Sequence, residues 1–335
     1  MSESDLAHSI EGSRDPAATR VGGPGRYPLG VARTRSPTMP EGSLVRKSAA
    51  VAADDDYFGE FHVYEPHRAG LPKMGPYFRE LWRRREFASE LAASTIRSNN
   101  SDSVLGILWN VLNPLLLAGV YYLLVVVLSS NKTLAADYFP HLLAGLFAFY
   151  FVAGCMTGGA TAVTSSGKII MNTAFPRILL PLSAVWIAVR KFLPTMIVYI
   201  AIVLLWPNVS LHWGSFLAIP MFFLIAVFGA GMAMLLATAT VYFRDTSSFL
   251  PYVSRIWLYV SPVLYYPETI KSHTVLFIER FNPPFSLLGG WGDLLVRGKM
   301  LTATMWLQSG MWSALSLLIG GLFFMSRERD FAVRL

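Results

Sequence analysis

Three basic side chains stand inside otherwise apolar stretches of this sequence. Arg190 and Lys191 lie well within the stretch 180–206, and Arg255 lies within the stretch 248–266. Charged groups at membrane depth are costly and usually face a cavity, a partner or the headgroups. Two interpretations are open. Either the long side chains snorkel to the headgroups, or they form a basic site for an anionic group such as a pyrophosphate.

The sequence lacks the pattern of a phosphate-binding P-loop. A phosphate-binding P-loop requires the pattern Gly-x4-Gly-Lys-Ser/Thr, whose backbone amides cradle the phosphates. The nearest approach is Gly158 with Gly167 and Lys168, but its spacing is wrong and Ile169 replaces the hydroxyl residue. We therefore expect no ATP hydrolysis and no cofactor in this chain.

Metal and acid–base chemistry are also poorly supported. Beyond the first hundred residues the acids are scattered, as Asp137, Glu268 and Asp293 illustrate, and the histidines form no metal-spaced cluster. The single cysteine, Cys155, lies in an apolar stretch, where packing is its default role. We expect no catalytic residues and no metal site.

Aromatic side chains gather in the outer halves of the apolar stretches. An interfacial belt of Tyr and Trp is a general property of membrane proteins. Several of these rings lie deeper than headgroups, however, and aromatic faces stack on sugar rings. A belt and a carbohydrate path are therefore both open for the group, which comprises Tyr121, Tyr122, Phe147, Phe149, Tyr150, Tyr199, Tyr259, Tyr265 and Tyr266.

The composition is that of a membrane protein. Of 335 residues, 53% are hydrophobic and only 15% are charged, and the mean hydropathy is +0.45. The isoelectric point near 9.5 would also suit nucleic-acid binding. We favour the membrane, because basic flanks are what cytoplasmic loops require.

The apolar stretches predict six transmembrane helices. A bilayer core of about 30 Å needs about 20 helical residues to cross it. Stretches of this length occur at 105–128, 138–161, 180–206, 214–240, 248–266 and 303–325. We also expect short half-helices in the connection between the last two. The predicted fold is an all-α membrane protein.

The remaining chain divides into two segments. Residues 1–75 are rich in Gly, Pro, Ser, Arg and Ala and predict a disordered cytoplasmic tail. Residues 76–100 combine arginines with Phe78 and Trp82 at helical spacing, which predicts an amphipathic interface helix. Residues 101–335 would then form the six-helix transmembrane domain.

The loop charges predict the orientation. Lys168, Arg177 and Arg244 lie in connections on the same side as the basic N-terminal segment, while the short opposite loops contain only Lys132. Lys and Arg favour the cytoplasmic side. We expect a multi-pass protein of the bacterial cytoplasmic membrane with both termini in the cytoplasm.

Several motifs together resemble the ABC-2 type permeases. They are LGILWNVLNPLLLAGVYYLL at 105–124, KIIMNTAFPRILLPLSAV at 168–185, VYFRDTSSFLPYVSRIWLYVSPVLY at 241–265 and NPP at 282–284. The resemblance covers about residues 76–335. It is strongest to exporters of O-antigen, teichoic acid and galactan, and the Arg- and Ala-rich tail suggests the mycobacterial-type galactan exporter.

The resemblance implies partners and a division of labour. Two copies of the chain would pair with two copies of an ABC ATPase subunit, which would bind ATP and Mg²⁺. Two cytoplasmic loops would transmit the conformational change of the ATPase to the permease. No nucleic acid is expected as a partner. The expected coupling residues are Lys168, Phe175, Pro176, Arg177, Phe243, Arg244 and Asp245.

The resemblance also implies that the first and fifth spans line the transport path. Together with the buried charges and deep aromatics, this suggests a set of channel or substrate-path residues. The set comprises Trp109, Asn110, Tyr121, Tyr122, Phe147, Tyr150, Arg190, Lys191, Tyr199, Arg255, Tyr259 and Tyr265.

The expected function is export of a polysaccharide linked to a polyprenyl pyrophosphate. One alternative is an ABC-2 exporter of small drugs or lipids. Another, less favoured, is a membrane enzyme of polyprenyl-sugar metabolism, which the scarcity of carboxylates argues against. The identity and length of the polymer do not follow from the sequence.

Overall fold

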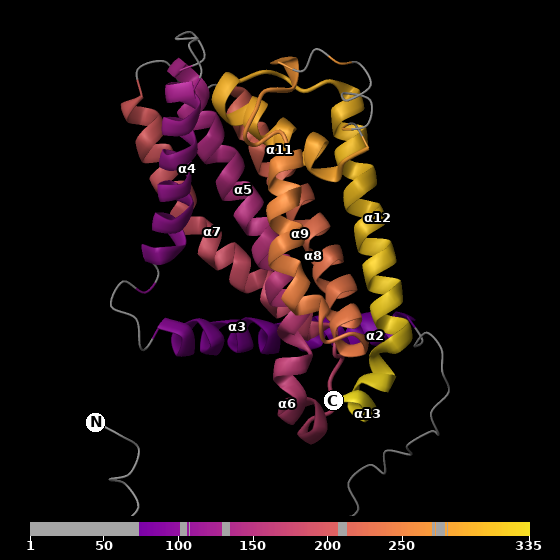
Figure 1. The fold of residues 1–335 in the computed structure, drawn as a ribbon. Coiled ribbons are helices and arrows are strands. Elements are labelled where there is room, and N and C mark those ends of the chain that lie inside the picture. Colours follow the sequence, from indigo (N-terminus) through magenta and orange to yellow (C-terminus); the bar gives the residue numbers. More distant parts are fainter. Residues whose placement is uncertain are drawn as a thin grey trace, which may run out of the picture. The chain divides into compact units, whose positions relative to one another are not determined.

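The computed structural model describes residues 74–100, 106, 108–128, 135–206, 213–269, 272, 279 and 281–335. Within these residues the chain forms helices joined by turns, and no strand occurs. The predicted tail, residues 1–75, lies outside the described residues except for its last two positions. The all-α fold class is thus confirmed (Figure 1).

Five helices in the described part of the chain are long and apolar enough to cross a bilayer. They run roughly side by side and upright in Figure 1. Their positions match five of the predicted spans. The five are α4 (Leu108–Leu128), α5 (Ala135–Ala162), α7 (Leu179–Leu205), α8 (Ala218–Tyr242) and α12 (Ala303–Arg327).

The predicted fifth span forms a shorter helix. Helix α9 (Thr246–Val260) has 15 residues, which is about 22 Å of helix against a hydrocarbon core of about 30 Å. The helix ends at Val260, just before Ser261 and Pro262, which the predicted span included. The count of six spans therefore stays a prediction.

Two short helices cross one end of the bundle. Helices α2 (Met74–Arg83) and α3 (Arg85–Asn100) run nearly at right angles to the long helices (Figure 1). They meet at Arg84, where the expected single interface helix is interrupted. Phe78 and Trp82 are exposed on α2, and the guanidinium of Arg85 lies 4.6 Å from the Trp82 ring. Aromatic and basic side chains thus lie together on α2 and at the start of α3, and their location in the membrane interface stays a prediction.

We call this the α6 end, because helix α6 (Gly167–Asn172) projects there beyond α2 and α3 (Figure 1). The turn η2 (Thr164–Ser166) leads from α5 into α6. Beside α6 lie η6 (Glu328–Asp330) and α13 (Phe331–Arg334), which follow α12. Both predicted coupling loops lie at this end of the bundle.

The opposite end, called the α11 end, carries several short helices. In the connection where short half-helices were expected lie η4 (Pro267–Thr269), α11 (Pro283–Gly292) and the π-helical turn η5 (Asp293–Arg297), while η3 (Trp213–Leu217) directly precedes α8. Most of α11 is buried. The indole of Trp291 donates a 3.1 Å hydrogen bond to the carbonyl of Ala144 on α5. Part of the connecting chain, including residues 273–278, lies outside the described residues.

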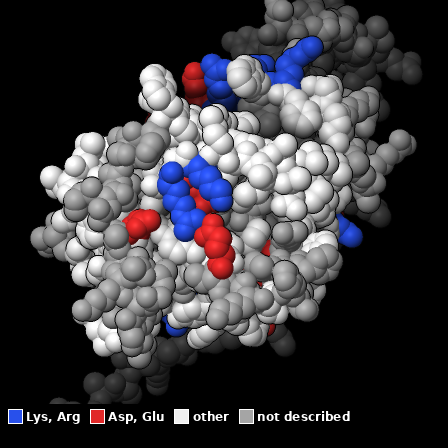
Figure 2. Space-filling model, turned by 90° about the horizontal axis from the view of Figure 1, so that it is seen from above, with Lys and Arg blue, Asp and Glu red and all other residues white. Residues whose placement is uncertain are grey.

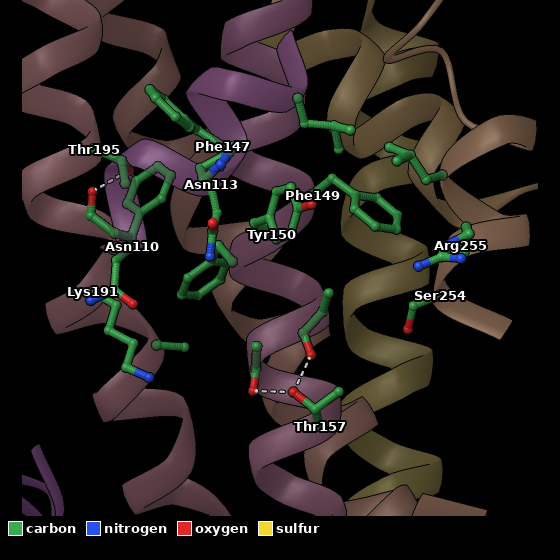
Figure 3. A pocket seen from close by; sticks show the side chains of 18 of the residues that line it. Asn110, Asn113, Phe147, Phe149, Tyr150, Thr157, Lys191, Thr195, Ser254 and Arg255 are labelled. Atoms are coloured by element: carbon green, nitrogen blue, oxygen red, sulfur yellow. Dashed lines mark hydrogen bonds between the residues drawn. The ribbon is translucent and has the colours of Figure 1, made fainter. Parts of the chain in front are cut away.

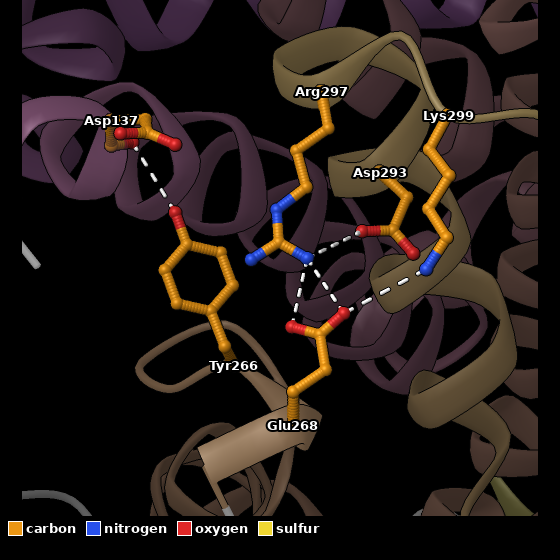
Figure 4. A network of polar contacts seen from close by, with 6 residues as sticks. All are labelled: Asp137, Tyr266, Glu268, Asp293, Arg297 and Lys299. Atoms are coloured by element: carbon orange, nitrogen blue, oxygen red, sulfur yellow. Dashed lines mark hydrogen bonds and ion pairs between the residues drawn. The ribbon is translucent and has the colours of Figure 1, made fainter.

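An ion network lies on the surface of the α11 end (Figure 4). Arg297 binds both carboxylate oxygens of Glu268 at 2.8 Å and lies 4.1 Å from the Tyr266 ring. Asp293 and Lys299 complete the network at 3.7 Å. Figure 2 shows described acidic and basic side chains gathered near the middle of this face. The network joins the segment after α9 to η5.

Helix α5 lies at the centre of the bundle and packs against both α7 and α8. The aromatic core includes Phe192 and Phe222, which stack at 4.5 Å, with Trp291 6.0 Å from each ring. Helices α8 and α12 meet through glycines. A Cβ added to Gly320 would lie 2.0 Å from the carbonyl oxygen of Gly231. Such backbone approach requires glycine.

Candidate functional site

A cavity of about 650 Å³ lies between α4, α5, α7 and α9. Helices α4, α7 and α9 each contribute one face, since their lining residues recur every three or four positions. On α4, for example, the lining includes Asn110, Asn113, Leu117 and Tyr121. Residues at this spacing share one side of a helix. The cavity is therefore built by regular helices whose inner faces carry bulky or polar side chains.

Two cations face this cavity. Lys191 from α7 and Arg255 from α9 lie on opposite sides of it, as Figure 3 shows. No ion pair within the described residues involves either of them. The described cavity lining also contains no carboxylate. This leaves two positive charges that an anion in the cavity could neutralise.

Neutral polar groups supplement the cations. Thr157 and Thr195 donate hydrogen bonds to carbonyls of their own helices, at 2.8 Å and 2.6 Å, which leaves their oxygens able to accept. The Ser254 hydroxyl is buried without a partner among the described residues. Asn113 adds an amide group. Sequence reasoning missed all four, although helical spacing from Asn110 and Lys191 was a usable signal for Asn113 and Thr195.

Aromatic rings form much of the remaining wall. Tyr121 on α4 and Tyr259 on α9 join hydroxyl to hydroxyl at 3.0 Å, and their rings are nearly perpendicular at 6.4 Å. Phe147 and Tyr150 contribute from α5 (Figure 3). The tyrosine pair bridges two helices that are otherwise separated by the cavity.

The structure brings together eight of the twelve predicted path residues. The eight that line the cavity are Trp109, Asn110, Tyr121, Phe147, Tyr150, Lys191, Arg255 and Tyr259. The other four lie outside the cavity, and for Tyr122 and Arg190 the reason is that adjacent residues on a helix are rotated by about 100°. Depth along the membrane was read from the sequence, but rotation about each helix axis was not.

Each of the four residues outside the cavity has its own neighbours. Arg190 donates a 3.2 Å hydrogen bond to Ser89 on α3 and lies 5.8 Å from the Trp186 ring. The three tyrosines contact the α11 side of the core. Tyr122 stacks on Tyr138, Tyr199 is fully buried, and Tyr265 donates to Glu279 at 2.5 Å.

The first predicted coupling loop is held from two sides. The ring of Phe175 lies 4.9 Å from that of Phe87 on α3. On the other side, the Arg177 guanidinium donates to the backbone carbonyl of Glu328. Lys168 is exposed on α6, and Pro176 follows the end of that helix by four residues.

The second predicted coupling loop is a tight turn between α8 and α9. Phe243 and Arg244 are exposed there. Asp245 directly precedes α9, and its backbone carbonyl accepts from the amides of Ser248 and Phe249 at 3.0 Å and 3.1 Å. Both loops thus present charged and apolar side chains at the α6 end.

The side chains that line the cavity suit binding and passage. Within the described residues no group of three His, Cys, Asp or Glu side chains could hold a metal ion. Amides, hydroxyls and aromatic rings offer weak contacts to a polyhydroxylated chain, and the two cations offer a stronger contact to an anion. Lining of this kind is typical of a path through a membrane protein.

Comparison with known proteins agrees with this geometry. The profile of the ABC-2 type transporter family matches residues 89–290. An O-antigen export system permease protein RfbA of Klebsiella pneumoniae is 30% identical over 203 residues, which make up 59% of this chain and 76% of that protein. The Myxococcus xanthus protein of the same name is 26% identical over 258 residues, 76% of this chain and 97% of that protein. The chain therefore belongs to the ABC-2 type transporter family.

Proposed function

We propose that this chain is the permease subunit of an ABC transporter that exports polysaccharide linked to a polyprenyl pyrophosphate. The observation that carries the proposal is the cavity with Lys191 and Arg255 on opposite sides and no carboxylate in its described lining. A pyrophosphate would place its negative charge between these two cations. Charge-assisted contacts of this kind are about twice as strong as neutral hydrogen bonds.

The rest of the lining suits the sugar chain. Trp109, Tyr121, Tyr150 and Tyr259 supply ring faces, and Asn110 supplies an amide. Individually weak contacts suit transport, because a tightly held polymer would not move. The related proteins are named as O-antigen export permeases, which supports a polymeric cargo over small drugs or lipids.

The cavity of one chain is proposed as half of a path. Trp109, Tyr150 and Tyr259 line it and yet are 43%, 41% and 50% exposed in the single chain. A second copy placed against this side would cover these rings and close the path. We therefore propose a homodimer with the cavities facing each other.

Energy is proposed to come from two copies of a separate ABC ATPase subunit, which binds ATP and Mg²⁺. The exposed groups of α6 and of the 243–245 turn would dock this subunit. Because Lys168, Arg177 and Arg244 lie at the α6 end, this end is assigned to the cytoplasm by the preference of basic loops for that side. The chain would then lie in the bacterial cytoplasmic membrane with both termini in the cytoplasm.

Depletion of the protein in its host tests the proposal. We expect finished lipid-linked polysaccharide to accumulate on the cytoplasmic side while surface polymer is lost. The chemistry of the accumulated polymer then distinguishes O-antigen, teichoic acid and galactan. Unchanged synthesis and display would contradict the proposal, and so would a block in polymer synthesis itself, which indicates an enzyme.

A further inference from the structure

The segment Arg327–Arg334, at the end of α12 and in η6 and α13, contacts three separate parts of the α6 end. The first is the interface helix α2. The Tyr77 hydroxyl donates a 2.7 Å hydrogen bond to the side chain of Glu328, and Glu328 is buried. Burial, followed by the charge of Glu328, raises the pKa of Tyr77, so this phenol remains a donor at any physiological pH.

The second contact is with the loop after α6. The Arg177 guanidinium donates to the backbone carbonyl of Glu328 and reaches that of Arg329 at 3.4 Å. On the far side of the same loop, Arg84 donates a 2.6 Å hydrogen bond to the carbonyl of Ala174. The loop is thus held between the interface helices and the segment Arg327–Arg334.

The third contact is with the end of α8, directly before the 243–245 turn. The Tyr242 hydroxyl donates to the Asp330 carboxylate at 3.1 Å. Arg334 lies 4.3 Å and Arg327 lies 5.7 Å from the centre of the Tyr242 ring. Arg327 also pairs with Asp330 at 3.8 Å. Tyr242 is therefore held by both its hydroxyl and its ring.

These polar contacts rest on an apolar cluster that is separate from the main core. Phe331 is fully buried and lies 5.1 Å from Phe324. The same cluster includes Ile170 of α6, Ile178 of the following loop and Val241 of α8. Packed interiors of this kind resist deformation and transmit displacement. The three contacts are therefore parts of one packed unit.

We propose that the segment Arg327–Arg334 is a coupling bridge that makes the interface helix and both ATPase-coupling loops move as one body. The proposal rests on the proposed function, since it concerns the same ATPase stroke. Without the bridge, a displacement of α6 would act directly on α5 and α7. A displacement of the 243–245 turn would act directly on α8 and α9. With the bridge, either displacement also moves α2 and the other loop.

The distance between the two loops tests the bridge. Ser165→Cys and Ser248→Cys place spin labels near the loops without altering the expected docking residues. The native Cys155 is buried and does not compete for the label. Labelled chains diluted into unlabelled chains in host membranes report distances within one chain. Pulsed electron paramagnetic resonance is then recorded with and without a non-hydrolysable ATP analogue.

We expect one narrow distance that is the same in both states for the native sequence. The double variant Tyr242→Leu/Asp330→Ala breaks the contact with α8, so its distance distribution should broaden and shift when the analogue binds. Polymer exported per ATP hydrolysed should fall about fivefold, a typical size for coupling between two sites. Tyr242→Phe keeps the ring between the arginines and should retain most of the coupling.

A second, milder variant tests the bridge even if the double variant misfolds. Tyr77→Phe removes only the hydrogen bond from α2, so it should leave the loop distance unchanged but reduce export per ATP. Native-like distances and export in both variants would overturn the bridge. Loss of coupling with an equal loss of folded protein would also count against it. If the native protein exports no polysaccharide, the proposed function fails instead.

Discussion

The cavity and the α8–α12 contact are built by opposite means from the same kind of helix. Around the cavity, rings such as Tyr121, Phe147 and Tyr150 hold four helices apart. Between α8 and α12, Gly231 and Gly320 let two backbones touch. A Cβ on Gly231 would lie 2.3 Å from the backbone of Ser316. Bulky residues keep space open in one region, and glycines remove it in the other.

The two regions also treat polar groups differently. In the α8–α12 contact, Ser313 and Ser316 donate to carbonyls of α8 at 2.8 Å and 3.0 Å. In the cavity, Lys191 and Arg255 take part in no ion pair among the described residues, and the Ser254 hydroxyl has no partner there. The hydroxyls of Ser313 and Ser316 thus help to join the two helices of this scaffold. The cavity keeps polar groups available for a ligand.

The largest expected effect comes from breaking the scaffold. Gly320→Ala forces a Cβ against the Gly231 carbonyl, so α12 must move away from α8. Overpacking of this kind costs about 1–3 kcal/mol, more than the helix propensity gained. We expect less folded protein in the membrane and a lower thermal midpoint.

Gly310→Ala is the matched control on the same helix, since nothing lies within 4 Å of its added Cβ. Its stability should stay equal or rise by up to about 1 kcal/mol from helix propensity. Equal stability of the two alanine variants would show that the close approach is not required, and the scaffold interpretation would fail.

The next largest effect concerns the cavity charges. The double variant Lys191→Gln/Arg255→Gln should lower export at least about tenfold, because each charge-assisted contact contributes about 1.5–3 kcal/mol. Folded protein should be unaffected, since neither side chain forms an ion pair within the described residues. Surface polysaccharide and thermal stability are measured together.

Arg190→Gln provides the control. This arginine is adjacent in sequence but contacts Ser89 and Trp186 instead of the cavity. The substitution removes one positive charge at the depth of Lys191, so we expect nearly normal export. A loss as large as that of the double variant would mean that the basic charge of this region matters and the cavity does not.

The spans were predictable because the bilayer leaves few alternatives. A long apolar stretch can satisfy its backbone only as a helix, so the predicted 180–206 differs from the observed Leu179–Leu205 by one residue at each end. The fifth stretch was drawn too long. Its apolar residues continue past Ser261 and Pro262, but the helix does not.

The facing of side chains was much less predictable. A surface helix of a soluble protein reveals its buried face by an apolar stripe, but a membrane helix is apolar on both its lipid and core faces. The neighbours Tyr121 and Tyr122 therefore look equivalent in the sequence. Only the packing of α4 directs Tyr121 to the cavity and Tyr122 to Tyr138. The contacts of Arg327–Arg334 were missed for a related reason, since they link segments far apart in sequence.

A smaller effect separates the ring from the hydroxyl of the tyrosine pair. Tyr259→Phe removes the bridge to Tyr121, which should change stability by less than about 1 kcal/mol and leave export within about twofold. Tyr259→Ala also removes the ring, and ring contacts of about 0.5–1.5 kcal/mol predict a few-fold loss. Equal export by both variants would contradict a role for the ring face. Export is measured as surface polymer per folded permease.

The smallest effect concerns Arg297, whose paired charge contrasts with the cations of the cavity. Its hydrogen bonds hold the pKa of Glu268 below the ordinary value, with a further contribution from its charge. A lowered acid pKa contributes stability that is present above the ordinary pKa of about 4.5 and is lost as the pH falls through the folded-state pKa. Because Glu268 is largely exposed, solvent screening limits the gain to below about 1 kcal/mol.

The comparison of native protein with Glu268→Gln isolates this contribution. In the native protein alone, Asp293 obscures the contribution of Glu268 to stability. Burial raises the pKa of Asp293, so protonation at low pH relieves the cost of burying its charged carboxylate and stabilises the fold. The variant keeps Asp293, so subtracting its stability removes that opposing effect. The native advantage in thermal midpoint should be present at pH 7 and shrink below about pH 4.5. If the native advantage in thermal midpoint persists undiminished at pH 3, Glu268 acts through packing and not through its charge. The ion pair would then add nothing to stability, and Arg297 would differ from Lys191 and Arg255 only in position.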